Sequence, residues 1–333
     1  KLDLTDEQRR VLERHHLSFV RAGAKLSSSA KARVKEINAR LASLVTQFMQ
    51  NVLKDEQSWT LVLEGDEDLA GLPDTMRAAA AQAAKEKGLE GKHAITLARS
   101  SVEGFLTFSA RRDLREQAFK AWTSRGANGN ETDNRAILAE AVQLRDEHAR
   151  LMGFKSFAEF SLDDTMAKRP ETVRDLLQAV WPKAVSRAAE EREALALEAR
   201  REGSNFDIAP WDWRYYSEKV RKARFDLDES ELRPYLQLEN MIAAAFDCAH
   251  KLFGLNFKEL PKAPKYHPDV RVWEVTSKDG THAGVFLGDY FASPSKRSGA
   301  WMSHFRHQHN IGKGQTPVIV NVLNFAKGAD GEP

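Results

Sequence analysis

The chain has 333 residues, of which 42% are hydrophobic and 29% are charged, and its formal net charge at pH 7 is only +2. This is enough material for one large or two modest globular domains. Basic and acidic side chains are interleaved along the chain, which argues against a nucleic-acid partner. No apolar run reaches the roughly 20 residues of a membrane span, so no membrane partner is expected either.

Most of the first two thirds of the sequence has helical periodicity. Residues 27–49 place apolar side chains three or four positions apart, which predicts a long helix with one buried stripe. Two further helices are expected over 73–88 and 133–152. The pattern continues over 170–203, where Pro182 predicts a bend or a break. The predicted core is therefore helix on helix.

Short strands are predicted in two places. Residues 58–63 and 93–98 could pair with each other as a small excursion. Residues 271–276 and 281–287 flank a Lys-Asp-Gly sequence at 278–280, which is a strong hairpin signal. A small antiparallel sheet laid against helices is therefore expected near the C-terminal end.

The last part of the sequence has the pattern of an interrupted domain. Residues 317–325 form an apolar strand that needs neighbours to bury it. Residues 326–333 have a loop-like composition, and no closing element follows them. We therefore interpret the chain as a fragment, and the remaining portion of the same polypeptide is an expected partner.

A single cysteine, Cys248, allows no internal disulfide bond. A reducing compartment is the simpler inference, and no signal-peptide pattern opens the chain, so we expect a cytoplasmic location. Cys248 lies in an amphipathic helical stretch. A buried structural thiol is the default expectation for such a position.

Several sequence blocks occur in the order found in one known family. The blocks are 123–130, 164–168, 210–216, 231–235, 267–275, 297–302, 317–325 and 331–333. Their order resembles the thimet oligopeptidase family of zinc metallopeptidases, and most closely its bacterial peptidyl-dipeptidase (dipeptidyl carboxypeptidase) branch. The resemblance runs over essentially the whole chain.

The resemblance implies a mainly α fold, with long helices that form part of a neurolysin-like two-lobed peptidase. It implies a helical lobe segment over 1–265, with the β excursion near 58–98, and a small antiparallel sheet region over 266–333 that leads to a zinc-binding helix. That helix carries His-Glu-x-x-His in the family. None of the ten histidines here stands in that pattern. Zinc is therefore implied for the complete enzyme, with no metal ligand and no catalytic residue in this chain.

The same resemblance implies that the chain supplies the wall of a channel for short peptides. In related peptidases an edge strand before the zinc helix binds the substrate backbone. Gly299, Ala300 and Trp301 occupy that place in the family order, so they are the expected substrate-binding residues. An ordinary strand, in which Trp301 and Met302 serve only packing, is an equally open reading.

Two other clusters have simpler interpretations. His304, His307 and His309 are spaced like metal ligands, but no single helix or strand presents all three, and surface histidines are expected. Trp211 and Tyr215 lie four residues apart and are expected to pack on one core face, while Asp212 and Arg214 could cap or brace it.

The function implied is that of a peptidase which hydrolyses short peptides and releases C-terminal dipeptides, with this chain alone inactive. The alternative is a catalytically dead remnant that works as a peptide-binding or scaffold protein.

Overall fold

The computed structural model describes residues 3–226, 232, 235–293, 295–297 and 299–325. These residues form two compact units, made of 1–55 with 124–191 and of 56–123 with 192–333. Positions 231, 233, 234 and 298 of the blocks quoted above, and all of 326–333, lie outside the described residues. Within the described ranges, no helix combines the length and the apolar character needed to cross a membrane.

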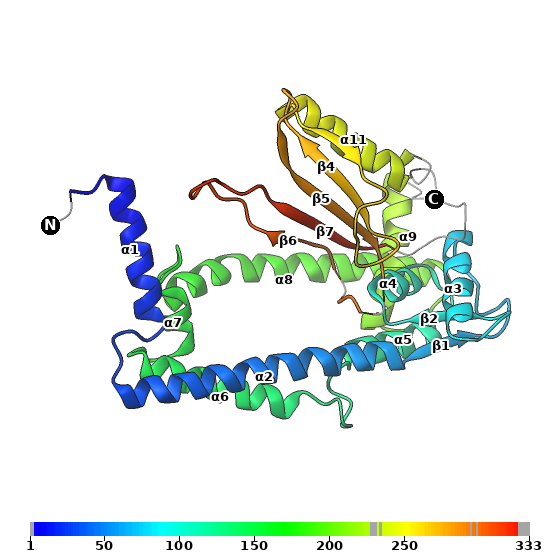
Figure 1. The fold of residues 1–333 in the computed structure, drawn as a ribbon. Helices are drawn as coiled ribbons and strands as arrows, with labels where there is room; N and C mark the ends of the chain where they lie inside the picture. The colour runs from blue at the N-terminus through cyan, green and yellow to red at the C-terminus, as the bar shows by residue number, and fades with distance from the viewer. Residues whose placement is uncertain (1–2, 227–231, 233–234, 294, 298, 326–333) are drawn as a thin grey trace. The chain divides into compact units, whose positions relative to one another are not determined.

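The first unit is helical (Figure 1). Its elements are α1 (Asp6–Arg21), most of α2 (Ser28–Ser58), α6 (Arg135–Leu151), α7 (Phe157–Leu162) and the first part of α8 (Pro170–Arg201). The predicted stripe on α2 is confirmed in part, because Val34, Ile37 and Leu44 are buried, whereas Val45 and Met49 of the same run are about half exposed. Helices predicted over 133–152 and 170–203 are confirmed as α6 and α8.

The loop before α6 is held by hydrogen bonds to a buried carboxylate. Asp55, near the end of α2, accepts hydrogen bonds from the backbone N–H of Gly126 (2.7 Å) and from Asn128 Nδ2 (2.8 Å). The Thr132 hydroxyl also donates to Asp55. Because a buried charge is costly without partners, these donors fix the conformation of the glycine-containing block 123–130.

The predicted break at Pro182 does not occur. α8 is one continuous helix that contains Pro182 in its interior. Proline removes one backbone N–H and crowds the preceding turn. Trp181 and Val185 beside it are 70% and 50% exposed, so this turn has room to adjust without ending the helix.

The second unit begins with a small α/β excursion. Its elements are β1 (Thr60–Leu63), α3 (Asp74–Glu86), β2 (His93–Thr96), α4 (Arg99–Phe108) and α5 (Arg112–Thr123). β1 and β2 pair antiparallel, with Thr60 opposite Thr96, as the sequence predicts. Leu63 and Ile95 of these strands pack with Phe105 of α4 in one buried cluster.

A buried ion-pair network joins α5 to the short helix η1 (Pro210–Asp212), which leads into α9 (Trp213–Phe225). The fully buried Asp212 carboxylate accepts from Arg112 Nη2 at 2.8 Å and from Arg115 Nη2 at 2.9 Å. The hydrogen bond to Asp212 raises the pKa of the Arg112 guanidinium, so Arg112 stays protonated and positively charged. Segments about 100 residues apart in sequence are thereby held together.

The aromatic residues around this network have packing roles. Trp211 meets the ring of Phe119 edge-on at 6.3 Å between ring centroids. Tyr215 meets Tyr216 edge-on at 5.1 Å and lies under the Arg115 guanidinium. Trp211 and Tyr215 therefore pack as expected, but on different partners.

A five-stranded sheet forms the rest of the second unit, with α11 (Leu238–Phe253) along one of its faces (Figure 1). The strands are β3 (Asn256–Glu259), β4 (Arg271–Thr276), β5 (His282–Phe291), β6 (Trp301–Arg306) and β7 (Val318–Phe325). Their order in the sheet is β3-β4-β5-β7-β6. The predicted hairpin is confirmed as β4 and β5, and the apolar run 317–325 is confirmed as β7.

The fold class is confirmed, and one strand pairing adds to it. β5 and β7 pair parallel, while the other neighbours pair antiparallel. The parallel pair arises because β7 turns back from β6 and inserts between β6 and β5. The small sheet near the C-terminal end is therefore mixed.

The expected burial of Cys248 is wrong, because Cys248 is exposed. α11 covers the sheet with Leu238, Ile242 and Phe246, which lie four residues apart on one helical face. Position 248 lies two residues beyond Phe246 and so points about 200° around the helix from it. Cysteine at this site is a surface residue.

We predict that Asp212→Ala lowers the free energy of unfolding by about 3–5 kcal/mol, because two guanidinium groups lose a buried counter-ion. Urea unfolding followed by circular dichroism measures this. The matched change Glu103→Ala removes a partly exposed partner of Arg99 and Arg214 and should cost less than about 1 kcal/mol. Equal losses in the two variants would contradict the prediction.

Candidate functional site

Strand β6 lies at one edge of the sheet, with β7 as its neighbour in the strand order. Its pairing with β7 runs from Trp301 opposite Val322 to Arg306 opposite Val318. An edge strand presents unpaired backbone N–H and C=O groups on its outer side, and such groups can pair with another extended chain. The edge of β6 is therefore a candidate binding site for a peptide backbone.

The three residues predicted to bind substrate lie where this strand begins. Gly299 has a φ of +105°, Ala300 is exposed, and Trp301 is the first residue of β6. Asn324 Nδ2 on β7 donates to the Gly299 carbonyl at 2.6 Å and to the Arg297 carbonyl at 3.1 Å. The turn into β6 is thus fixed from the neighbouring strand.

Trp301 also has the packing role that the sequence leaves open. Its half-buried ring packs against the apolar cluster that contains Val320 and Val322. The Arg297 guanidinium lies 4.8 Å from the ring centroid, within the range of a cation–π contact. Met302, next in sequence, is 67% exposed. The strand therefore has one anchored and one exposed face at its start.

A buried ammonium group lies below the loop that leads to β6. Lys296 Nζ is 2.7 Å from Asp289 Oδ1, and only 10% and 7% of the two side chains are exposed. The same ammonium donates to the Leu323 carbonyl at 3.0 Å and to the Phe291 carbonyl. Tyr266 donates its hydroxyl to the other Asp289 oxygen at 2.7 Å.

The surroundings of Tyr266 favour its protonated form. Burial, with the hydrogen bond to the Asp289 carboxylate as the second cause, raises the pKa of the Tyr266 phenol well above its usual range. The phenol therefore remains a hydrogen-bond donor at neutral pH. Asp289 is the residue on which Tyr266 and Lys296 meet.

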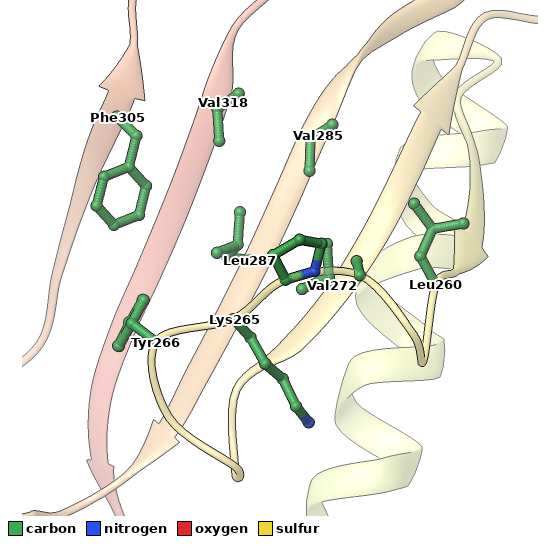
Figure 2. Close-up of a pocket in the computed structure, with 10 residues that line it drawn as sticks. Leu260, Lys265, Tyr266, Val272, Val285, Leu287, Phe305 and Val318 are labelled. Atoms are coloured by element: carbon green, nitrogen blue, oxygen red, sulfur yellow. The ribbon is translucent and has the colours of Figure 1, made fainter.

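An apolar groove of about 540 Å³ lies on the sheet face away from α11 (Figure 2). Strand residues Val272, Val285, Leu287 and Val318 form its floor, and the segment with Leu260, Lys265 and Tyr266 passes over them. Phe305 of β6 lines the groove on the edge side, where its ring centroid is 6.0 Å from that of Tyr266. The groove is therefore continuous with the candidate edge.

His304, His307 and His309, near this edge, do not come together around a common point. The rings of His304 and His307 are adjacent, with centroids 3.4 Å apart, and both residues are exposed. His309 instead forms an isolated β-bridge with Gln315. Over the described part of the chain, no three His, Cys, Asp or Glu side chains come together in a way that could hold a metal ion. These residues therefore do not fit the zinc site of the family, and no chemical step is assigned to them.

Sequence reasoning found the start of β6 but missed Asp289, Lys296 and Asn324. One signal was available. Asp289 interrupts the run Val285-Phe-Leu-Gly-Asp-Tyr-Phe291, and a carboxylate within an apolar strand needs a buried partner. The identity of that partner depends on contacts that the local sequence does not encode.

Comparison with known proteins matches this chain to peptidases. Residues 105–333 match the family model described as Peptidase family M3. Over 333 residues the chain is 39% identical to dipeptidyl carboxypeptidase of Escherichia coli (strain K12). The aligned residues make up 100% of this chain and 49% of that protein. Over 329 residues it is 32% identical to oligopeptidase A of Haemophilus influenzae, with 97% of this chain and 48% of that protein covered. The chain spans about half the length of the curated relatives it matches.

We predict that Gly299→Ala lowers the free energy of unfolding by about 1–3 kcal/mol, since an L side chain rarely adopts its positive φ. An added Cβ would meet nothing within 4 Å, so the cost comes from the backbone alone. Gly65 has equally open surroundings without a positive φ, and Gly65→Ala should change stability by less than about 0.5 kcal/mol. Denaturant unfolding of both variants is the measurement, and a neutral Gly299→Ala would contradict the prediction.

Proposed function

The chain belongs to peptidase family M3, and on that basis we propose that it forms part of the peptide channel of a zinc metallopeptidase. The substrates are short peptides, and the complete enzyme releases dipeptides from their C-terminal ends. The support for dipeptide release is the greater identity to a protein named dipeptidyl carboxypeptidase than to one named oligopeptidase A. The proposed location is the cytoplasm, in keeping with a chain that has one cysteine.

The observation that carries this proposal is that β6 is the last strand on its side of the sheet in the part of the chain that the structure describes, which leaves its outer edge open there. A peptide that adds to the sheet as a further strand gains main-chain hydrogen bonds, which do not depend on its sequence. Such binding suits a peptidase that accepts many short peptides. In this arrangement Gly299, Ala300 and Trp301 meet the substrate backbone where the edge begins.

Catalysis in this proposal requires groups outside residues 1–333. When bound, zinc would polarise the attacking water and the scissile carbonyl. The 333 residues contain no His-Glu-x-x-His sequence that could supply two ligands and a general base. The helical region 1–265 and the sheet region 266–333 therefore provide the wall of the channel and not its chemistry.

The alternative function is peptide binding or scaffolding without catalysis. The same open edge would serve it, so the two functions differ in the length of the natural polypeptide. The intact mass of the protein made from its native gene separates them. A mass of 37.5 kDa favours the binding protein, whereas about twice that mass favours the peptidase segment.

We predict that the 333-residue chain does not hydrolyse peptides. Purified chain, shown by mass spectrometry to be free of longer species, should release no product from an internally quenched five-residue peptide in the presence of Zn²⁺. Hydrolysis that stops on addition of a chelator would contradict this part of the proposal.

We also predict that the chain binds such a peptide through β6. Hydrogen exchange should slow at the backbone amides of 301–306 when peptide is added. The amides of β3, at the opposite edge of the same sheet, serve as the internal control and should not change. N-methylation of the peptide amides should weaken binding about tenfold for each hydrogen bond of about 1.4 kcal/mol that is lost. Protection at β3 instead of β6 would contradict the proposed site.

A further inference from the structure

The buried ammonium of Lys296 lies where three parts of the sheet meet. Its acceptors are the carboxylate and the backbone carbonyl of Asp289 on β5, the Phe291 carbonyl where β5 ends, and the Leu323 carbonyl on β7. Lys296 itself belongs to the loop that continues into β6. A single side chain thus connects the loop before the edge strand with β5 and β7.

Asp289 reaches the far part of β6 as well. Its second oxygen accepts from Tyr266, whose ring lies against Phe305 near the end of β6. One carboxylate therefore restrains the edge strand near its start through Lys296 and near its end through Tyr266. Asn324 adds a further restraint through the carbonyls of Arg297 and Gly299.

We propose that Lys296 is a positioning residue for peptide binding, and that Lys296, Asp289 and Tyr266 together hold β6 in the position from which it pairs with an extended peptide. This inference rests on the proposed function. Binding by strand addition requires several backbone groups at fixed spacing, so a displaced edge loses several hydrogen bonds at once.

The chemistry of the site explains why a side chain that donates fewer hydrogen bonds could not replace Lys296. Three carbonyl oxygens and a carboxylate converge on one donor group, and a buried acceptor without a donor is unfavourable. Removal of the ammonium leaves these oxygens facing one another below the loop. The loop is then free to move away from β5 and β7, and the start of β6 moves with it.

The test measures binding of the five-residue peptide to the full chain carrying Lys296→Met. We expect affinity to fall at least tenfold and hydrogen exchange at 301–306 to rise at least tenfold, while exchange in α11 and β3 is unchanged. The matched control is Lys258→Met on β3, which removes an exposed lysine at the opposite edge and should bind peptide as the unsubstituted chain does.

A second variant guards against loss of folding. Lys296→Met combined with Asp289→Asn removes the unpaired buried charge and leaves an acceptor for Tyr266. This double variant should also bind at least tenfold more weakly. Tyr266→Phe keeps the ring against Phe305 but loses its hydrogen bond to Asp289, and should weaken binding about threefold.

The effect of N-methylation distinguishes a residue that positions the edge from one that only stabilises the fold. If Lys296 sets the position of the edge, N-methylation of the peptide should weaken binding to the unsubstituted chain but make little further difference to binding by the Lys296 variants. Unchanged affinity and unchanged exchange at 301–306 in either Lys296 variant would overturn the inference.

The outcomes also separate this inference from the proposed function. If the unsubstituted chain binds no peptide, the proposed function fails. Hydrogen exchange at 301–306 then still decides whether Lys296 positions β6, since it should rise in the Lys296 variants without any peptide present.

Discussion

The pairing of β7 on both sides is the constraint on which the C-terminal region depends. β7 runs parallel to β5 and antiparallel to β6, so its backbone is satisfied along both edges while β6 remains at the border of the sheet. Val318, Val320 and Val322 face the same side as the groove, which ties this pairing to the apolar cluster there. A shift of β7 by one residue would turn these valines to the other face.

A second constraint acts on the helical part of the same unit. Asp212 has both arginines of α5 as partners, and the chain before α9 is held through them. Neither Arg115 nor Asp212, both of which are buried, could remain there alone without a large desolvation cost. In the Trp-Asp-Trp sequence at 211–213, the carboxylate therefore matters to the structure as much as the aromatic rings do.

The sequence predicted those features that depend on local periodicity and turn chemistry. The stripe on α2, the β1–β2 pair and the β4–β5 hairpin are of this kind. Features that depend on distant partners were not predicted. The parallel β5–β7 pair, the Asp212 network and the orientation of Cys248 each depend on which segments meet in space, and the effect of Pro182 depended on the exposure of its turn.

The candidate site follows the same division. Family resemblance led to Gly299, Ala300 and Trp301, and the structure adds that they begin an edge strand. Lys296 was not singled out, because a lysine in a loop of small residues has the sequence pattern of a surface residue. Its burial depends on Asp289 and on two carbonyl groups that only the assembled sheet brings together.

The exposure of Cys248 has a chemical consequence for the whole chain. As the single thiol in the sequence, it is a unique attachment point on α11, which covers the sheet face opposite the groove. A maleimide dye placed there would leave the groove and the β6 edge unmodified. Conversely, air oxidation can join two copies through this sulfur. A dimer that disappears with reductant would then report thiol chemistry on α11 and not association of the open sheet edges.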